Sequence, residues 1–431
     1  MIKFILAFYD SMIRLHVNPK LSVSIQKKLT EKRVVNAVRQ AYFNVPYYTE
    51  IYDKAGVNIN AIRTIEDLKK LPMITKDEIR ENFPDKIVAR GTDLKKCHYS
   101  ATTGSTGRSL PFVYSPKTYA YYIATNMRVH TMIGYKPWKH KIAYIKYTAI
   151  NTPGSDGPFF KSVHIPSIIP VENQIAMLKE AKADYIIGYA SIVYEISQKI
   201  SKNDLKVIKP KFILVNSELS TQDQRDFIAS VFNCPVYDEY STEETWMVAS
   251  QCKNKNYHLF IDNVWVEFLD KDGNEVGPYE TGEMVLTTLQ SPVMPFIRYR
   301  IGDLGQKSDK LCSCGSKLPI LHSFEGRADD SFILPSGKFV SSLKLLNTFT
   351  KYIKKYLHLM EEFKVIQKEK GLIVIELVKG KEYDENKFNE LIHALEEILG
   401  EPVTIKVEFV DNINLHGSIK RKAIESWVKV K

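Results

Sequence analysis

Hydrophobic residues near the start of the chain recur at helical spacing. Val34, Val38 and Ala41 mark one face of a segment from about residue 22 to 50, and Pro46 ends the pattern. Apolar positions three and four residues apart share one side of an α-helix. The pattern therefore predicts an N-terminal helical segment that packs through this face.

The middle of the chain alternates short apolar runs with stretches of helical periodicity. The strand-like runs are 141–147, 183–188, 212–215 and 236–238, and the helical stretches between them are 171–181, 191–202 and 221–232. Strands that alternate with helices are joined by crossover connections, which make the sheet largely parallel and cover both of its faces. The pattern predicts an α/β fold.

The pattern changes after Trp265. Val-rich strands broken by Asp272-Gly273 and Gly277-Pro278 predict a small antiparallel β subdomain. About a hundred residues after Asp330 have a pattern of their own. It predicts a helix at 343–356, strands at 363–367 and 372–378, a helix at 385–399 and a strand at 403–410. Two helices against three strands would make a compact α+β lid.

Composition and charge narrow the class of protein. The chain has 431 residues, of which 44% are hydrophobic and 26% charged, as in a soluble globular protein of two or more domains. Its formal charge is +10, with Lys and Arg interleaved with Asp and Glu. This balance favours anionic ligands such as nucleotides, acidic sugars or membrane surfaces. No nucleic-acid-binding motif accompanies it, so we expect no nucleic-acid partner.

Cysteine usage and the N-terminal stretch bear on location. Five cysteines spread over a long chain do not form the pattern of a disulfide-stapled secreted domain, so we expect a cytoplasmic protein. The apolar stretch 1–10 is too short to span a membrane and lacks a signal-peptide cleavage site. We favour a helix packed on the protein body, with peripheral membrane contact as the alternative.

Four short segments carry candidate chemistry. They are Ser-Ala-Thr-Thr-Gly-Ser-Thr-Gly-Arg at 100–108, Tyr-Ser-Thr-Glu-Glu at 240–244, Tyr-Arg-Ile-Gly-Asp at 299–303 and Gly-Arg-Ala-Asp-Asp at 326–330. Glycines in the first would let backbone N–H groups approach phosphate oxygens, and its hydroxyl groups can donate further hydrogen bonds. It is not a Walker loop, because Gly104 and Gly107 are too close and Arg108-Ser109 replaces Gly-Lys-Ser/Thr.

The order and spacing of these segments resemble the adenylate-forming enzymes, the acyl-CoA synthetases and their relatives. The resemblance is strongest to the phenylacetate-CoA ligase-like and capsular-polysaccharide-biosynthesis branch, which the segments 44–48 and 71–76 also match. It implies a large N-terminal adenylate-forming domain, residues 1–328, with mixed and parallel sheets covered by helices and a small antiparallel β subdomain. A small, mobile α+β C-terminal lid domain would follow at 329–431, with its hinge at Asp329.

The resemblance also implies roles for individual residues. Tyr240 would stack on adenine, Asp303 would accept the ribose hydroxyls, and Arg327 would meet ribose or phosphate. Glu244 would bind magnesium, with Glu243 kept open because the motif can slip by one residue. Ser217 and Glu218, between the nucleotide motifs, would border the acid and adenine pockets. The phosphate loop would contribute Thr102, Thr103, Gly104, Ser105, Thr106 and Gly107, with Thr103 also catalytic.

One position departs from the family pattern. The late motif of the family has a lysine directly after glycine, and here Ser418 follows Gly417. Lys420, two residues later, would serve as the catalytic lysine after a small shift, because a flexible ammonium needs only proximity. Otherwise the chain adenylates slowly, acts on a preformed adenylate, or has lost catalysis.

Two pairs of soft ligands suggest a metal site. Cys312 and Cys314 form a Cys-x-Cys pair, and Cys252 and His258 lie upstream. Together they could bind a tetrahedral zinc ion with a closed ligand shell, hence structural. Buried free thiols are the alternative.

The leading hypothesis is a ligase that converts a carboxylic acid and ATP into an acyl-adenylate and then transfers the acyl group to a thiol or amine. CoA is one candidate thiol, and a role in surface polysaccharide biosynthesis follows from the resemblance alone. The rivals are amide or ester formation on a sugar without CoA, and a degenerate nucleotide-binding protein. The sequence does not specify the oligomeric state.

Overall fold

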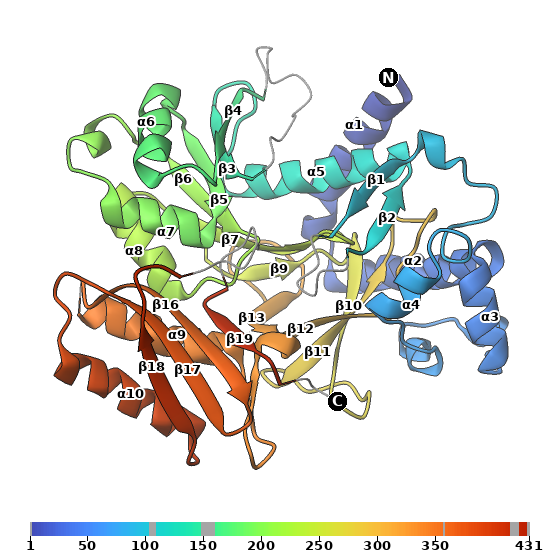
Figure 1. The fold of residues 1–431 in the computed structure, drawn as a ribbon. Coiled ribbons are helices and arrows are strands. Elements are labelled where there is room, and N and C mark those ends of the chain that lie inside the picture. The colour runs from blue at the N-terminus through green and yellow to red at the C-terminus, as the bar shows by residue number, and fades with distance from the viewer. Residues whose placement is uncertain (1, 103–108, 148–159, 357, 414–421, 429–431) are drawn as a thin grey trace. The chain divides into compact units, whose positions relative to one another are not determined.

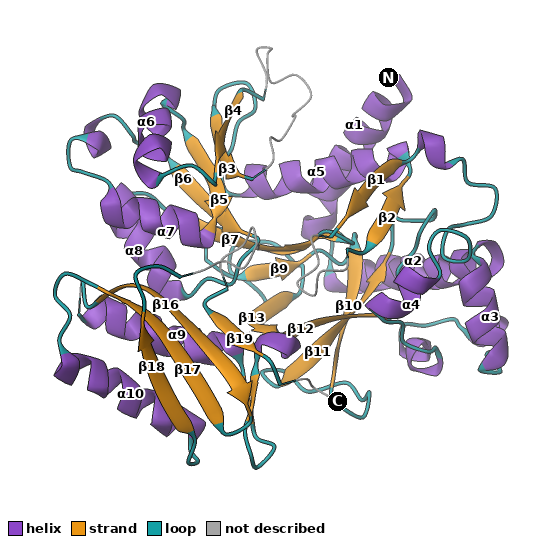
Figure 2. Cartoon of the chain, viewed as in Figure 1, coloured by secondary structure: helices purple, strands orange, loops and turns teal. Residues whose placement is uncertain are grey.

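The computed structural model describes residues 2–102, 109–147, 160–356, 358–413 and 422–428. The chain divides into two compact units, each built from two distant stretches of sequence. Unit 1 consists of Met1–Gly134 and Glu239–Phe324, and unit 2 of Tyr135–Asp238 and Glu325–Lys431. Both contain sheets flanked by helices (Figure 1, Figure 2), which confirms the predicted α/β class.

Helices make up most of the N-terminal part of unit 1. They are α1 (Ile2–Val17), α2 (Val23–Asn44), α3 (Pro46–Lys54), α4 (Lys76–Glu81) and α5 (Pro116–Met132), with 3₁₀ turns η1 (Asn18–Lys20), η2 (Ile59–Ala61), η3 (Glu66–Lys70) and η4 (Leu94–Lys96). The predicted helical segment at about 22–50 is confirmed as α2 and the start of α3. Ser22 caps α2 by accepting a hydrogen bond from the Ile25 N–H, and Pro46 opens α3, where its missing N–H leaves no helical bond unmade.

Among the described residues, no helix has both the length and the apolar content that a membrane span needs.

Strands of unit 1 form one hairpin and one larger sheet. The hairpin pairs β1 (His98–Ala101) with β2 (Pro111–Tyr114). The sheet has the order β10-β11-β12-β13-β9-β8-β7. Its strands are β7 (Val236–Thr242), β8 (Trp246–Gln251), β9 (Tyr257–Leu259), β10 (Val264–Leu269), β11 (Thr281–Thr288), β12 (Tyr299–Ser308) and β13 (Ile320–Arg327). The antiparallel strands predicted after Trp265 are confirmed in β10, β11 and β12.

A buried ion pair fixes α5 within unit 1. The Arg128 guanidinium donates to both carboxylate oxygens of Asp262, over 2.8 and 3.0 Å, and lies 3.7 Å from the centre of the Phe260 ring. Both side chains are at most 2% exposed. Removing one partner of such a pair leaves an uncompensated buried charge, so the pair specifies where α5 packs.

The first part of unit 2 is the predicted parallel sheet. Its order is β7-β6-β5-β3-β4, where only the first residues of β7, up to Asp238, belong to unit 2, and each of these neighbouring pairs is parallel. The strands are β3 (Ile142–Lys146), β4 (Ser162–Pro166), β5 (Tyr185–Tyr189) and β6 (Phe212–Asn216), with helices α6 (Val171–Ala181), α7 (Ala190–Lys199), α8 (Gln222–Phe232) and the turn η5 (Asp204–Lys206). Every residue of β3 and β6 is buried, which explains why these strands are continuous apolar runs.

The second part of unit 2 has its own core. It contains η6 (Ala328–Asp330), β14 (Phe332–Ile333), β15 (Phe339–Val340), α9 (Ser342–Lys355), β16 (Met360–Glu369), β17 (Leu372–Lys379), α10 (Glu385–Leu399), β18 (Thr404–Phe409) and β19 (Ile424–Ser426). The sheet order is β18-β17-β16-β19. The three predicted strands are β16, β17 and β18; the sequence did not predict β14, β15 and β19, which are two or three residues long and give no periodic signal.

Candidate functional site

Two tyrosine–carboxylate hydrogen bonds join the second and third sequence segments in unit 1. The Tyr240 hydroxyl, on β7, donates to Asp303 Oδ2 on β12 over 2.6 Å. Glu244 lies just beyond the end of β7. Its Oε1 accepts a hydrogen bond of 3.0 Å from the hydroxyl of Tyr299, at the start of β12. Each segment therefore supplies a tyrosine to the carboxylate of the other.

This reciprocal pairing requires the sheet of unit 1 to curl. In the sheet order β7 and β12 are separated by β8, β9 and β13. Across a flat sheet they would lie about 19 Å apart, four strand spacings. Side chains of the two segments are instead in hydrogen-bonding contact, so the sheet curls enough to bring β7 close to β12. The curl brings together two predicted site residues, Glu244 and Asp303.

The short turn between β7 and β8 orients its two glutamates differently. The Glu244 side chain is 4% exposed, whereas Glu243 is an exposed residue. The Tyr114 hydroxyl donates to the backbone carbonyl of Glu243, and the Thr245 N–H donates to the Thr242 hydroxyl over 3.0 Å. The turn is thus held by its backbone, with the Glu244 carboxylate directed inward.

Aromatic packing supports the same turn. Trp246, which follows it, has a φ of +58°, in the left-handed region that non-glycine residues seldom adopt. Its ring stacks on Tyr122 of α5 with ring centres 5.2 Å apart, and Tyr114 meets Tyr122 edge to face. Non-glycine residues persist in this conformation where their surroundings fix it, often at functional sites.

Lys76 is a site candidate to which the sequence analysis gave no role. It begins α4, and its ammonium lies 3.8 Å from Glu244 Oε1. The backbone of the preceding Ile74 bonds to β12, through Ile74 N–H to Arg298 C=O and Arg300 N–H to Ile74 C=O. Farther along α4, Arg80 donates to the Ser109 carbonyl, at the exit of the predicted phosphate loop. Helix α4 therefore connects that exit with the Glu244 carboxylate.

The predicted phosphate loop is described only at its neck. Thr102 and Leu110 close it with two hydrogen bonds of 3.0 Å, one from the Thr102 N–H to the Leu110 carbonyl and one from the Leu110 N–H to the Thr102 hydroxyl. The predicted residues Thr103, Gly104, Ser105, Thr106 and Gly107 lie outside the described residues. Thr102 shapes the loop base through its side chain.

In unit 2, Ser217 and Glu218 lie just beyond the carboxyl end of β6. Ser217 has a φ of +68°, and its hydroxyl is 3.2 Å from the ammonium of the buried Lys146, which ends β3. Lys146 also donates to Asn216 and lies 4.2 Å from the centre of the Tyr189 ring, at the end of β5. Glu218 accepts a hydrogen bond from the Ser191 N–H. The carboxyl edge of a parallel sheet is a common ligand site, so Lys146 is a second candidate that no motif revealed.

The fourth segment ends β13 and forms η6 in unit 2. The Arg327 carbonyl accepts a hydrogen bond from the Ser331 hydroxyl, and Asp329 is exposed. Asp330 pairs with Lys422 over 2.9 Å, which ties the turn to the last described stretch of the chain. Lys420 and Ser418 lie outside the described residues.

The four predicted metal ligands meet in unit 1. One ligand atom from each of Cys252, His258, Cys312 and Cys314 lies within 4.8 Å of all the others. The Cys252 and Cys312 sulfurs are 3.6 Å apart, and Cys314 Sγ is 3.3 Å from His258 Nε2. A disulfide would need about 2.05 Å, whereas two thiolates on one tetrahedral zinc ion lie about 3.8 Å apart. The donor set and its spacing fit zinc.

The surroundings of this cluster suit metal ligation. His258 Nδ1 lies 3.3 Å from the Leu318 carbonyl, which leaves Nε2 directed at the cluster. The Asn254 N–H donates to Cys252 Sγ, and the Cys314 N–H donates to Cys312 Sγ, each over 3.4 Å. Pairing of β9 with β13 places His258 opposite Ile320, next to the loop that carries the two later cysteines.

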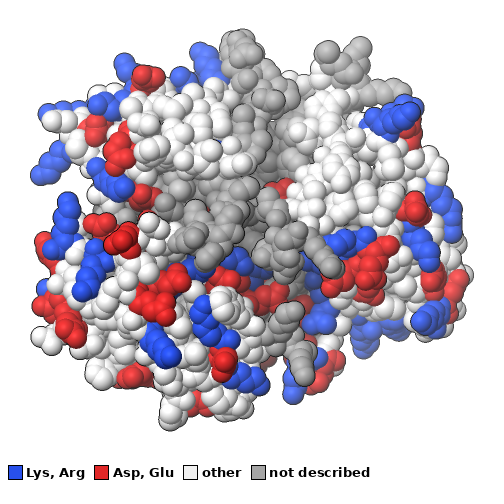
Figure 3. Space-filling model, viewed as in Figure 1, with Lys and Arg blue, Asp and Glu red and all other residues white. Residues whose placement is uncertain are grey.

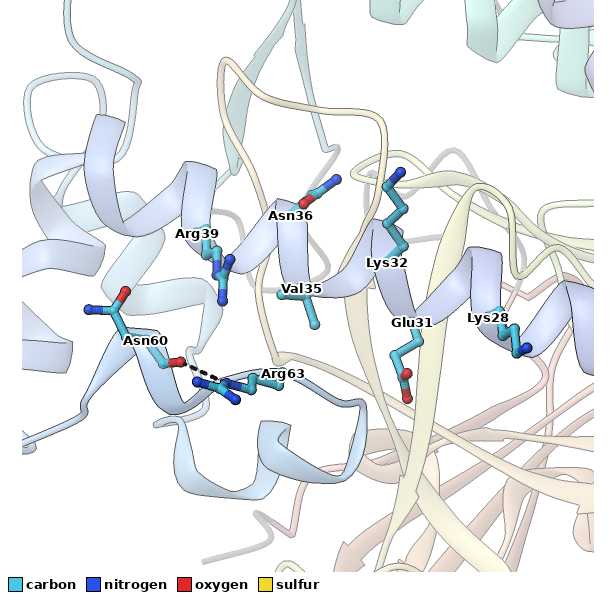
Figure 4. A pocket seen from close by; sticks show the side chains of 8 residues that line it. All are labelled: Lys28, Glu31, Lys32, Val35, Asn36, Arg39, Asn60 and Arg63. Carbon is cyan, nitrogen blue, oxygen red and sulfur yellow. Dashed lines mark hydrogen bonds between the residues drawn. The ribbon is translucent and has the colours of Figure 1, made fainter.

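A pocket of about 700 Å³ opens elsewhere in unit 1 (Figure 4). Four cations, one acid and three uncharged residues line it: Lys28, Lys32, Arg39, Arg63, Glu31, Val35, Asn36 and Asn60. Figure 4 shows Arg39 reaching from α2 toward the segment that carries Asn60 and Arg63. None of the predicted site residues lines this pocket.

Comparisons with known proteins agree with the fold and the motifs. Residues 332–426 match the family model of the CapK C-terminal domain. Phenylacetate-coenzyme A ligase of Aromatoleum evansii is 26% identical over 339 residues, covering 73% of both chains. Protein CapK of Staphylococcus aureus is 24% identical over 416 residues, covering 89% of this chain and 85% of CapK.

A solved structure shows the same fold. The chain is similar to 2-hydroxyisobutyryl-CoA ligase in its postadenylation state with R3-HIB-AMP, with a TM-score of 0.77 and 18% identity over 91% of this chain and 87% of that ligase. Together with the segments at 240–244 and 299–303, these likenesses confirm the predicted resemblance of the chain to the adenylate-forming enzymes of the phenylacetate-CoA ligase-like and CapK branch.

Proposed function

We propose that the protein activates a small carboxylic acid with ATP, releases pyrophosphate, and transfers the acyl group of the resulting acyl-adenylate to a thiol with release of AMP. The observation that carries the proposal is the reciprocal pair of hydrogen bonds, Tyr240 to Asp303 and Tyr299 to Glu244. These bonds hold in the curled sheet of unit 1 the two carboxylates to which the motif resemblance assigns ribose and magnesium. The phenylacetate-coenzyme A ligases among the sequence relatives, and the 2-hydroxyisobutyryl-CoA ligase structure, support CoA as the first thiol to test.

Each carboxylate suits its proposed ligand. Asp303 is 7% exposed and can accept charge-assisted hydrogen bonds from the two ribose hydroxyls. Glu244 would hold Mg²⁺ because a hard cation prefers carboxylate oxygen, and the bound ion would offset phosphate charge. We prefer Glu244 to Glu243 since its carboxylate faces Tyr299 and Lys76. The role of Lys76 would be to position this carboxylate before the nucleotide binds.

The phosphate loop and the lysine of the late motif complete the proposal. Thr102, Thr103, Gly104, Ser105, Thr106 and Gly107 would bind phosphate oxygens, with the hydrogen-bonded neck at Thr102 and Leu110 setting the width of the loop. Ser217 and Glu218 would border the acid and adenine pockets, and Arg327 would contact ribose or phosphate. Lys420 would neutralise the developing charge between the acid and the α-phosphate.

The last hundred residues would act as a lid that turns at Asp329, dividing the chain at 328/329. The CapK C-terminal model match at 332–426 supports this boundary. So does a hydrophobic core whose buried members all lie between Phe332 and Ile424. The Asp330–Lys422 ion pair would hold the present arrangement of this turn. Likeness to CapK supports a role in surface polysaccharide biosynthesis, and the cysteine usage supports a cytoplasmic location.

We also propose that Cys252, His258, Cys312 and Cys314 bind one structural zinc ion. When bound, zinc would cross-link the turn after β8, strand β9 and the loop between β12 and β13. Four protein ligands leave no open position, so the ion would stabilise unit 1 without contacting the reactants.

The ribose assignment predicts a specific loss in Asp303→Asn. This isosteric change removes a charged acceptor and should weaken ATP binding by about 1.5–3 kcal/mol, roughly 10- to 150-fold. Isothermal titration with ATP and Mg²⁺ measures the loss. Asp309→Asn is the matched control, because Asp309 also accepts a 2.6 Å hydrogen bond from a tyrosine, Tyr279, but lies outside the motifs. Equal affinities for both variants would refute the ribose role of Asp303.

A further inference from the structure

Helix α1 has apolar residues on two opposite faces. The inner face packs on α5: the Phe4 ring centre lies 6.4 Å from that of Tyr119, and His16 Nε2 lies 3.1 Å from the Thr131 hydroxyl. Ser11 and Leu15 are buried on this side. Figure 1 shows α1 lying along α5. The helix is therefore fixed to unit 1 through this face.

The outer face of α1 carries an exposed apolar stripe. Leu6, Tyr9, Ile13 and Val17 are 64%, 62%, 67% and 49% exposed. At 3.6 residues per turn these positions lie within about 80° of arc. A helix that is apolar on both sides is usually buried in a core or in contact with lipid. We call these four residues the α1 stripe.

Positive charge is concentrated in the same part of the chain. The first 39 residues contain eight Lys and Arg and two acidic residues, so they carry six of the ten net positive charges of the protein. Lys20, Lys28 and Lys32 are exposed, as are the apolar Val23 and Ile25 at the start of α2. On the face that Figure 3 shows, Lys and Arg are interspersed with Asp and Glu. Cations beside an apolar helix face are typical of segments that bind anionic lipid surfaces.

We infer that α1 and the start of α2 dock the protein on the surface of an anionic lipid bilayer. The α1 stripe would enter the interface between headgroups and acyl chains, with α1 parallel to the surface. Tyr9 suits that depth because its ring is apolar and its hydroxyl polar. The basic residues of α2 would remain in water among the anionic headgroups. The inference is independent of the proposed ligase activity.

Vesicle co-sedimentation of the full chain tests this inference. Vesicles of pure phosphatidylcholine are compared with an equimolar mixture of phosphatidylcholine and phosphatidylglycerol. We expect at least about tenfold tighter binding to the anionic vesicles, weakened as salt rises. The double variant Leu6→Gln/Ile13→Gln should bind them at least about tenfold more weakly. Ile168→Gln, at a position 69% exposed in unit 2, should bind like the unchanged protein.

The measurement has outcomes that would overturn the inference. It fails if the unchanged protein binds neither vesicle, or if the double variant binds as tightly as the Ile168→Gln control. Sedimentation velocity tests whether a second copy of the chain covers the α1 stripe instead. A protein that is dimeric, that Leu6→Gln/Ile13→Gln makes monomeric, and that binds no vesicles would assign the stripe to this dimer contact. Both altered side chains are exposed, so thermal unfolding should stay unchanged and verify that the variants fold.

Discussion

Glu244→Gln should reduce acid-dependent ATP–pyrophosphate exchange by about 10²–10³-fold, equivalent to about 3–4 kcal/mol of transition-state stabilisation. The amide keeps the shape of the side chain and its contact with Tyr299 but removes the charge that would hold Mg²⁺. Binding of ATP without Mg²⁺ should change little, because the loop at 102–107 and Asp303 would still contact the nucleotide. Exchange rates at saturating Mg²⁺ and titrations with and without the ion separate the two effects.

Glu243→Gln is the matched control for this prediction. It makes the same chemical change one residue away, at an exposed position of the same turn. We expect less than about a threefold effect, as for a solvated surface charge. A larger loss in Glu243→Gln than in Glu244→Gln would transfer the magnesium role to Glu243 and contradict the orientation argument.

Cys312→Ser should abolish zinc binding and lower the melting temperature by roughly 10 °C. Loss of a structural metal typically lowers the free energy of unfolding by about 4 kcal/mol or more. In a unit of this size, each kcal/mol lowers the melting temperature by a few degrees. The other three ligands would remain, but the ion would lack its fourth ligand. Elemental analysis of the purified protein gives the zinc content, and calorimetry gives the melting temperature.

Cys234→Ser controls for the change from thiol to hydroxyl. Cys234 and Cys312 are 8% and 7% exposed, and Cys234 lies outside the cluster. This variant should keep its zinc and lose only the smaller stability of a buried thiol. The zinc proposal fails if the unchanged protein contains no zinc, and Cys312→Ser melting no lower than Cys234→Ser would remove the structural role.

Hydrophobic periodicity predicted most of the regular structure because burial imposes it. The predicted helices at 171–181 and 385–399 coincide with α6 and α10, and the apolar runs at 141–147 and 212–215 contain or match β3 and β6 within a residue or two. Each of these elements buries a whole face, so hydrophobic residues recur in it at regular spacing. The strands β14, β15 and β19 are only two or three residues long, too short for a periodic pattern, and β19 also depends on pairing with the distant β16.

The candidate site was predicted only in part, for a related reason. Motif resemblance identified Tyr240, Glu244 and Asp303 one by one, but their mutual contacts depend on the curl of the sheet. Lys76 and Lys146 had no motif role. Lys76 comes near Glu244 because Ile74 bonds to the chain at the start of β12, whereas Lys146 comes near Ser217 because β3, β5 and β6 are neighbouring parallel strands. The four cysteine and histidine residues that the sequence suggested as metal ligands lie together, and the β9–β13 register explains why they meet.

The central claim is that this chain joins a carboxylic acid to AMP. The most direct test is ATP–pyrophosphate exchange by the full-length protein across a panel of aromatic, fatty and amino acids. We predict exchange that requires both Mg²⁺ and at least one acid class, and that falls in Glu244→Gln but not in Glu243→Gln. Tight ATP binding without acid-dependent exchange for any member of the panel would contradict the claim and identify a nucleotide-binding protein that has lost ligase chemistry.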